Sequence, residues 1–256
     1  MKIYSWNVNG LRAILKKDFI PWIIDSSPDI LCVQETKLQE NNLDESITNI
    51  EGYYSYFSHG IKKGYSGVAI YSKFQPKSIK TGIGIEKFDI EGRILIAEYE
   101  DFTLMNIYFP NGQSSEERLK YKMEFYDAVL DYCNLEVSKG TNLIICGDYN
   151  TAHTPMDIKN AKANEKTSGF LPMERAWIDK FISNGYIDTF RYVNPDTIKY
   201  SWWSYRFKAR ERNAGWRIDY FFVSDNMINR ILKAEILNDV LGSDHCPVTL
   251  EIKSCV

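Results

Sequence analysis

Just past the middle of the chain, eight residues read Leu143-Ile144-Ile145-Cys146-Gly147-Asp148-Tyr149-Asn150. Four apolar residues in a row indicate a strand that is buried on both faces. Gly147 permits a sharp backbone turn at the end of that strand. Asp148 and Asn150 are then expected at the rim of a sheet, where α/β folds place their ligands. An ordinary strand followed by an Asx turn explains the octapeptide equally well, so its meaning depends on the rest of the chain.

The rest of the chain alternates between strand and helix patterns without a break in composition. Residues 11–26 have helical spacing that is interrupted at Pro21, and residues 115–137 predict the longest helix. Residues 94–109 predict a hairpin. We therefore expect one mixed α/β domain over residues 1–256, with two sheets packed face to face and helices outside them.

A weak internal echo links residues 30–36 with residues 143–151. Both segments are apolar strands that end in an acid. The echo indicates either a pseudo-repeat or a chance likeness between two buried strands.

The composition is that of an ordinary intracellular globular protein. The net charge is −3, so any nucleic-acid binding must come from a local basic face. Five cysteines without CxxC spacing indicate reduced thiols rather than a disulfide framework or a zinc site. The sequence shows neither a signal peptide nor an apolar run long enough to span a membrane. We expect a cytoplasmic protein that makes no membrane contact.

Polar residues follow or interrupt several other apolar runs in the same way. They are Asn7, Asn9, Glu35, Tyr108, Asn111, Asp148, Asn150, Asp219, Asp244 and His245. Asp219 interrupts an otherwise apolar strand, where a buried carboxylate needs a partner or a metal. His245 is one of three histidines, so few side chains can transfer protons near neutral pH. Taken singly, Asn7 could instead cap the helix that follows it, and Tyr108 could be an ordinary strand aromatic.

Carboxylates, amides and one histidine at a single rim suit Mg²⁺-assisted hydrolysis of a phosphate ester. Mg²⁺ prefers hard oxygen ligands, so Glu35 and Asp244 are candidate ligands, and Mn²⁺ is the alternative ion. Asp148 is the carboxylate best placed to activate water. The amides of Asn7 and Asn150 and the phenol of Tyr108 can donate hydrogen bonds to the transition state.

Seven motifs, in order along the chain, resemble the exonuclease III family of apurinic/apyrimidinic (AP) endonucleases. The motifs are Trp6-Asn7-Val8-Asn9-Gly10-Leu11-Arg12, Gln34-Glu35-Thr36-Lys37, Gly64-Tyr65-Ser66-Gly67-Val68, Tyr108-Phe109-Pro110-Asn111, Cys146-Gly147-Asp148-Tyr149-Asn150, Gly215-Trp216-Arg217-Ile218-Asp219-Tyr220 and Gly242-Ser243-Asp244-His245-Cys246-Pro247. A match of seven motifs in order is far more specific than one short pattern.

The resemblance implies a four-layer α/β sandwich of the DNase I type, with two packed mixed sheets flanked by helices. It implies Mg²⁺-dependent hydrolysis of DNA on the 5′ side of an abasic site, which leaves a 3′-hydroxyl. It also implies 3′→5′ exonuclease or 3′-phosphodiesterase activity in base excision repair. The expected substrate is double-stranded DNA with abasic sites or damaged 3′ ends, and the enzyme is expected to be a monomer.

The resemblance also implies roles for individual residues. Asp148 would handle the proton of the attacking water or of the leaving oxygen, and Asn150 would hold the scissile phosphate. His245 would contact the phosphate and be oriented by Asp219, and Tyr108 would donate to a phosphate oxygen or to the leaving group. Glu35 would ligate the metal, within a set formed by Glu35, Asn7, Asp148, Asn150, Asp244 and His245.

A DNA-binding face is indicated by residues 199–217, which hold six Lys or Arg and one acid among six aromatic residues. Such a mixture suits phosphate contacts and stacking on a flipped nucleotide. A solvated loop whose aromatics belong to the core is the alternative. The resemblance assigns Trp202 and Trp216 to the walls of an abasic-sugar pocket. The expected DNA contacts are Lys37, Tyr65, Asn111, Lys120, Asn164, Trp202, Arg206, Arg210 and Trp216.

Three positions depart from the pattern of some family members. Asn9 stands where some carry Asp, Trp202 where others carry Phe, and Thr167 replaces an Asn. These departures bear on metal stoichiometry and substrate breadth. Two other functions stay open, namely another metal-dependent phosphodiesterase of the same superfold and an inactive DNA-binding module. The basic–aromatic segment favours DNA over small headgroups, and the complete polar set argues against an inactive site.

Overall fold

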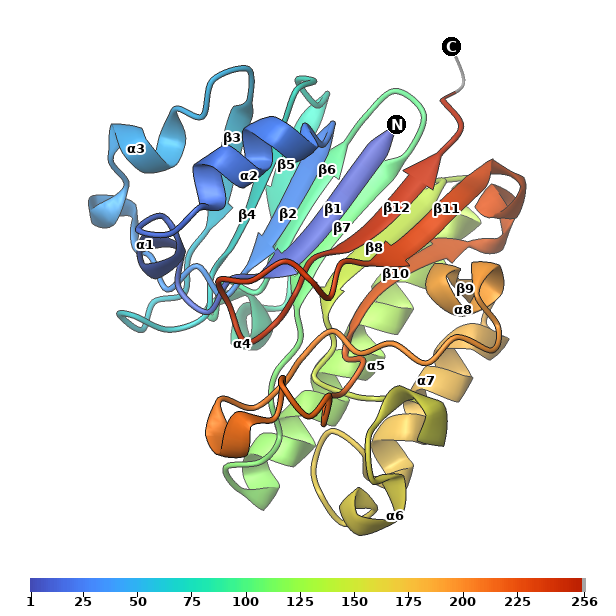
Figure 1. The fold of residues 1–256 in the computed structure, drawn as a ribbon. Coiled ribbons are helices and arrows are strands. Elements are labelled where there is room, and N and C mark those ends of the chain that lie inside the picture. Colours follow the sequence, from blue (N-terminus) through green and yellow to red (C-terminus); the bar gives the residue numbers. More distant parts are fainter. Residues whose placement is uncertain (255–256) are drawn as a thin grey trace.

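The computed structural model describes residues 1–254, and within them twelve strands form two six-stranded mixed sheets (Figure 1). The first sheet contains, in order across it, β11 (Ile231–Ile236), β12 (Val248–Ile252), β1 (Lys2–Asn7), β2 (Ile30–Gln34), β4 (Val68–Ser72) and β3 (Tyr54–Ser58). The second contains β5 (Ser78–Thr81), β6 (Ile94–Glu98), β7 (Thr103–Tyr108), β8 (Leu143–Asp148), β10 (Asp219–Ser224) and β9 (Tyr186–Asp188).

Both sheets have the same sequence of pairings. The third and fourth strands are parallel in each, β1 with β2 and β7 with β8, and the other neighbours are antiparallel. Strands β2 and β8, which carry the two echoing segments, therefore occupy equivalent central places. This equivalence favours the pseudo-repeat interpretation over chance.

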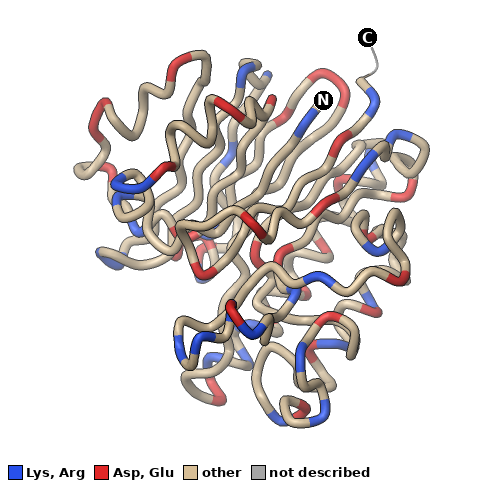
Figure 2. Tube along the Cα trace, in the orientation of Figure 1, with Lys and Arg blue, Asp and Glu red and all other residues tan. Residues whose placement is uncertain are grey.

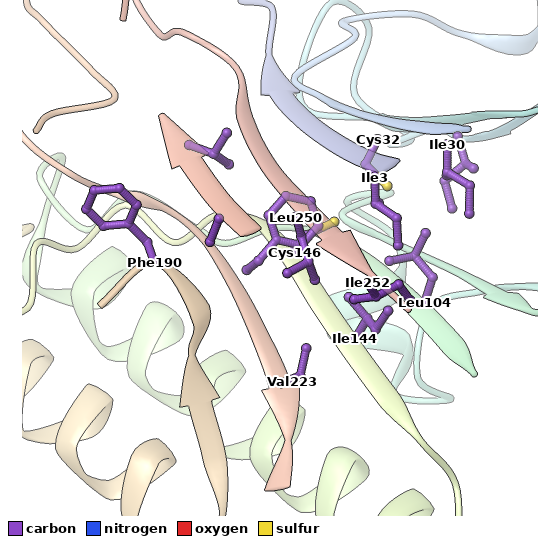
Figure 3. Close-up of a cluster of buried hydrophobic side chains, with 14 of the residues drawn as sticks. Ile3, Ile30, Cys32, Leu104, Ile144, Cys146, Phe190, Val223, Leu250 and Ile252 are labelled. Carbon is purple, nitrogen blue, oxygen red and sulfur yellow. The ribbon is translucent and has the colours of Figure 1, made fainter. Parts of the chain in front are cut away.

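Strand β8 is buried on both faces, as its unbroken apolar run predicts. Ile144 and Cys146 point into the core between the sheets, whereas Leu143 and Ile145 pack against the helices outside. Figure 3 shows the inter-sheet core, where Ile144 of β8 lies beside Leu104 of β7. Alternate side chains of a strand point to opposite faces, so a strand covered on both sides must be apolar throughout.

Helices cover the outer face of each sheet. The helices are α1 (Leu11–Ile14), α2 (Phe19–Ser26), α3 (Glu45–Thr48), α4 (Glu86–Asp89), α5 (Glu116–Ser138), α6 (Ala161–Asn164), α7 (Pro172–Ser183) and α8 (Thr189–Val193). Short 3₁₀ turns lie at Glu40–Asn42, Pro155–Asp157, Arg206–Lys208 and Asp225–Arg230. α1 and α2 pack on the first sheet, and α5 and α7 on the second (Figure 1). The expected four-layer sandwich is confirmed. No helix within residues 1–254 is long and apolar enough to cross a membrane.

Two local predictions were wrong. The helix expected over residues 11–26 is two helices, α1 and α2, and the interruption lies before Phe19 rather than at Pro21. Pro21 falls in the first turn of α2, where a missing N–H breaks no helical hydrogen bond.

Gly147 does not turn the chain at the end of the strand. It lies inside β8, paired with both neighbouring strands. A Cβ there would come within 1.8 Å of the Ile107 carbonyl oxygen, and its φ is +138°. Glycine is required because the backbone of β7 approaches too closely for any side chain. The turn itself begins after Asp148.

Candidate active site

Three site residues lie side by side on adjacent strands of the second sheet. Asp148, the last residue of β8, pairs with Tyr108 of β7 on one side and Asp219 of β10 on the other. The first sheet contributes Asn7 from the end of β1 and Glu35 from the residue after β2. The ends of both sheets therefore deliver their polar residues to one rim, as the strand-end pattern predicts.

The chain leaves two of these strands in a conformation that L-residues rarely adopt. Glu35 has φ +58° and Asn150 has φ +52°. Each such residue costs about 1–3 kcal/mol and persists only where the surroundings enforce it. The Glu35 carbonyl accepts from the Gly10 amide at 2.8 Å, and the Asn150 carbonyl accepts from the Lys122 ammonium at 2.8 Å. These hydrogen bonds hold the left-handed backbone at both residues, so that both side chains point toward the rim.

Asn7 connects the two sheets. Its Nδ2 donates to Glu35 Oε2 at 3.1 Å and to Asp148 Oδ2 at 2.9 Å. Its Oδ1 accepts from the Asn9 amide, and the side chain is fully buried. The cap of α1 is instead Gly10, so the helix-capping alternative for Asn7 is excluded.

A buried histidine lies between two carboxylates. His245 Nδ1 is 2.9 Å from Asp219 Oδ2, and Nε2 is 3.8 Å from Asp148 Oδ2. Burial alone would lower the pKa of His245, but Asp219 and Asp148 outweigh it and raise this pKa to about 10. The bond at Nδ1 leaves Nε2 on the side of Asp148, so the ring can present a proton there.

Asp148 is the carboxylate with the most perturbed proton affinity at this rim. Burial raises its pKa to about 7, with His245 opposing the rise and Asp219 adding to it. Such a group exchanges protons readily near neutral pH, which is what a general base or acid requires. The Tyr108 phenol donates to Glu35 Oε2 at 3.1 Å. Burial and the Glu35 carboxylate raise its pKa well above the usual value, so the phenol keeps its proton.

Oxygen donors that suit a hard divalent cation surround the same rim. Asp148 and Asp219 each offer a carboxylate oxygen, and these oxygens lie within 4.8 Å of each other and of a ring nitrogen of His245. Asp219 Oδ1 is buried without a hydrogen-bond partner, so it has a lone pair to offer. The Glu35 and Asp244 carboxylates face the same cavity. Oxygen-rich sites of this kind suit Mg²⁺ or Mn²⁺ rather than a thiophilic metal.

A cavity of about 230 Å³ opens at the rim. Its lining includes Glu35, Tyr108, Asn111, Asp148, Asn150, Gly169, Trp202, Trp216, Asp244 and His245. The Trp202 and Trp216 rings meet edge to face at 5.8 Å and form an aromatic wall. Trp202 Nε1 also donates to Asp244 Oδ2 at 3.1 Å, which ties the wall to the carboxylates.

The remaining expected DNA contacts lie in several different settings. Asn111 reaches the cavity and donates to Asn150. The Lys37 ammonium pairs with Glu35 Oε1 at 2.9 Å. Lys120 is exposed on α5, whereas Asn164 bonds to carbonyls of its own helical turn. A DNA contact remains a prediction for each of them.

The basic segment at residues 199–217 is less cationic than its sequence indicates. Arg217 is buried and pairs with Asp157 and Asp188, so it cannot be part of a DNA face. Arg210 donates to the carbonyls of Ser243, Asn238 and Val240. Arg206 stays exposed on the loops at the lower end of the molecule, where Figure 2 shows several Lys and Arg.

Three buried polar residues lie behind the site, and the sequence predicts none of these positions; it indicates instead that Lys122 could contact the DNA backbone, which its burial excludes. Ser201 Oγ donates to Asp219 Oδ2 at 2.6 Å. Lys122 is fully buried on α5, and Arg93 lies beneath Tyr108. A signal existed for Lys122, which shares a helix face with the apolar Tyr126. The sequence carries no comparable signal for Arg93, because the two tyrosines that it contacts, Tyr65 and Tyr108, lie 28 and 15 residues away along the chain.

Comparison with known proteins agrees with this geometry. The Endonuclease/Exonuclease/phosphatase family matches residues 4–245. The chain belongs to this family. Family relatives include the exodeoxyribonuclease of Bacillus subtilis, which is 46% identical over 254 residues and covers 98% of this chain and 99% of its own length.

Solved structures of family members have the same fold. An AP endonuclease from Archaeoglobus fulgidus has a TM-score of 0.89 at 29% identity, over 99% of this chain and 100% of that one. A 3′ phosphatase from Neisseria, bound to a product DNA hairpin, has a TM-score of 0.92 at 29% identity over the same shares. The resemblance of the sequence motifs to AP endonucleases is thus confirmed.

Proposed function

We propose that this chain is a Mg²⁺-dependent DNA repair nuclease that hydrolyses the phosphodiester on the 5′ side of abasic sites and also trims damaged 3′ ends. The similar proteins are an exodeoxyribonuclease, an AP endonuclease and a DNA-bound 3′ phosphatase. The observation that carries the proposal is the Asp148–His245–Asp219 group beside a cavity walled by two tryptophans. This arrangement joins acid–base chemistry to an aromatic-walled pocket of the kind that takes up a nucleotide flipped out of the duplex.

The divalent cation is proposed to bind at Glu35 and Asp244, within reach of Asn7, Asp148 and Asn150. Asn7 supports this placement because it holds Glu35 and Asp148 together from the buried side. When bound, Mg²⁺ or Mn²⁺ would offset the negative charge that develops on the phosphate oxygens.

The protein side chains bind the phosphate and transfer the protons. His245, held by Asp219, and the amide of Asn150 are the donors for the phosphate oxygens. Asp148 takes a proton from the attacking water as the water oxygen bonds to phosphorus. The P–O3′ bond breaks, the leaving 3′ oxygen takes a proton from solvent water to become the 3′-hydroxyl, and Asp148 releases to solvent the proton that it accepted. Tyr108 keeps its proton and donates a hydrogen bond to Glu35 Oε2.

The substrate is proposed to be double-stranded DNA, with the abasic sugar against the aromatic wall formed by Trp202 and Trp216. Contacts to the DNA backbone are proposed at Lys37, Tyr65, Asn111, Lys120, Asn164, Arg206 and Arg210. A single catalytic domain over residues 1–256, a monomeric state and action in the cytoplasm remain predictions. Cys255 lies outside the described residues, and within them Cys32, Cys133, Cys146 and Cys246 are free thiols.

The proposal is tested by incision of three duplexes that carry an abasic-site analogue, a nick with a 3′-phosphate, or a damaged base. Each is assayed with Mg²⁺ and with EDTA, and a mononucleotide phosphodiester serves as a small-substrate arm. We expect Mg²⁺-dependent cleavage of the abasic duplex. Cleavage of the small substrate alone would instead indicate a different phosphodiesterase.

Asp148→Asn tests the central role. Incision should fall by at least about 100-fold, because a positioned acid–base group contributes factors of that size, while binding of the abasic duplex is retained. Asp179→Asn is the matched control, since Asp179 is 72% exposed and lies on α7 away from the cavity. Retained turnover in Asp148→Asn would refute the assignment.

A further inference from the structure

Arg93 is an arginine buried beneath the site rather than exposed to substrate. Its side chain is 2% exposed, and it lies directly before β6. The guanidinium pairs with Glu91 at 2.5 Å, so its charge is compensated. A compensated, buried guanidinium has a fixed position, because its fork of donors allows few alternative geometries.

Arg93 holds both the ring and the backbone of Tyr108 in place. The guanidinium carbon lies 4.7 Å from the centre of the Tyr108 ring, and Nη1 donates to the Tyr108 carbonyl at 3.0 Å. The Tyr108 amide in turn donates to the Arg93 carbonyl at 2.9 Å. Ring and backbone are thus held together, which leaves the phenol pointing at Glu35.

The same guanidinium fixes Tyr65. Nη2 donates to the Tyr65 hydroxyl at 2.8 Å, and the guanidinium carbon lies 5.3 Å from the centre of that ring. Tyr65 is partly exposed in the segment that precedes β4. Arg93 therefore lies between a tyrosine at the protein surface and a tyrosine in the active-site cavity.

We propose that Arg93 is a positioning residue that sets the Tyr108 phenol for the reaction and links it to substrate contact at Tyr65. The inference rests on the proposed nuclease function. DNA that engages Tyr65 presses on a guanidinium whose other contacts are the ring and carbonyl of Tyr108. Binding at the surface is thereby transmitted to the phenol at the cavity through one rigid group.

Arg118 supplies a matched control. It binds the same Glu91 carboxylate at 2.6 Å and the same Tyr65 hydroxyl at 2.9 Å. Its guanidinium, however, lies over the ring of Tyr121 at 4.3 Å rather than over Tyr108. A change at Arg118 disturbs the Tyr65 end of the arrangement and leaves the Tyr108 end in place.

The test is a kinetic cycle on an abasic duplex with Mg²⁺. We expect Arg93→Lys to lower kcat about 10-fold, because lysine keeps the charge but loses the planar fork. In a Tyr108→Phe background the same change should alter kcat less than about 2-fold, since the phenol it positions is gone. Arg118→Lys should raise KM and leave kcat within about 2-fold.

Each outcome decides the inference. Equal effects of Arg93→Lys with and without the Tyr108 phenol, or an equal loss of kcat in Arg118→Lys, would overturn it in favour of a general brace. If Arg93→Lys loses its cooperative thermal transition, Arg93→Gln replaces it, and failure of both to fold also overturns the inference. Wild-type protein that does not incise the duplex refutes the proposed function itself.

Discussion

Replacing Lys122 by methionine should destabilise the protein and impair the active site together. Lys122 Nζ lies 2.6 Å from Glu174 Oε1, and both side chains are fully buried. The same ammonium donates to the Asn150 carbonyl at 2.8 Å and to Thr151 Oγ1 at 2.9 Å. Glu174 also accepts from the amide of Leu171 and from that of Gly169, which lines the cavity. The pair thus joins α5 and α7 to the turn that carries Asn150.

The expected loss of stability follows from the Glu174 carboxylate that the substitution leaves unpaired. Methionine fills a similar volume but leaves the Glu174 carboxylate buried and uncompensated. Removing one partner of a buried ion pair costs about 3–5 kcal/mol. In a chain of this size each kcal/mol shifts Tm by about 2–4 °C, so Tm should fall by about 6–20 °C. The turnover number should also fall, because the left-handed conformation of Asn150 loses the donor at its carbonyl.

The measurement is urea unfolding together with incision of an abasic duplex. Lys120→Met is the matched control for the unfolding measurement, since Lys120 is 79% exposed two residues away on the same helix. It should change stability by no more than about 0.5 kcal/mol. The double variant Lys122→Met with Glu174→Gln should regain at least half of the lost stability, because no unpaired charge remains.

Two results would contradict this reasoning. A loss below about 1 kcal/mol in Lys122→Met would mean that water reaches Glu174 and that the pair is not buried in solution. A double variant as unstable as the single one would mean that the cost is packing rather than charge.

Three further predictions concern the metal, the backbone and pH. Glu35→Gln should raise the Mg²⁺ concentration for half-maximal incision about 10-fold or more. Glu40→Gln, at an exposed position, is the control and should leave the Mg²⁺ titration unchanged. An unchanged titration in Glu35→Gln would mean that Glu35 does not bind the metal. Gly147→Ala should lower the free energy of unfolding by about 3 kcal/mol or more, measured by thermal unfolding. Gly140 also has a positive φ (+89°) but open space around it, so Gly140→Ala lacks the clash and should lower the free energy of unfolding less. Burial would raise the pKa of Asp157, but its arginine partners hold it well below the usual value. Its contribution is therefore present above about pH 4 and lost as pH falls further, so Asp157→Asn should flatten the acid side of a stability–pH curve.

Local sequence patterns were sufficient for the layers and for much of the rim. The run at residues 143–146 predicted a strand buried on both faces because its two sets of alternate side chains both had to be apolar. Polar residues at strand ends predicted that Asn7, Glu35, Tyr108, Asp148, Asp219, Asp244 and His245 gather at one place, and the structure brings them together. Their individual roles come from the family motifs and remain to be tested.

The errors share one cause. Gly147 was interpreted as a turn residue from its position in the sequence, whereas its requirement comes from Ile107 of a neighbouring strand. Residues 11–26 have one helical period, yet the structure forms two helices, α1 and α2, with a turn over residues 15–18 between them. Local pattern describes what a segment can form, and contacts between distant segments select among those forms.

Arg217 and Asp148 show what the sequence determines and what only the tertiary structure decides. In sequence Arg217 belongs to a basic, aromatic segment that indicates a DNA-binding face. In the fold it is 1% exposed and paired with Asp157 and Asp188. By contrast, Asp148 was placed at a strand end by the sequence alone. Only the tertiary structure set its distances to His245 and Asn7. The position of a residue in a strand depends on the local sequence, whereas the partners, burial and pKa of a charged side chain depend on residues far along the chain.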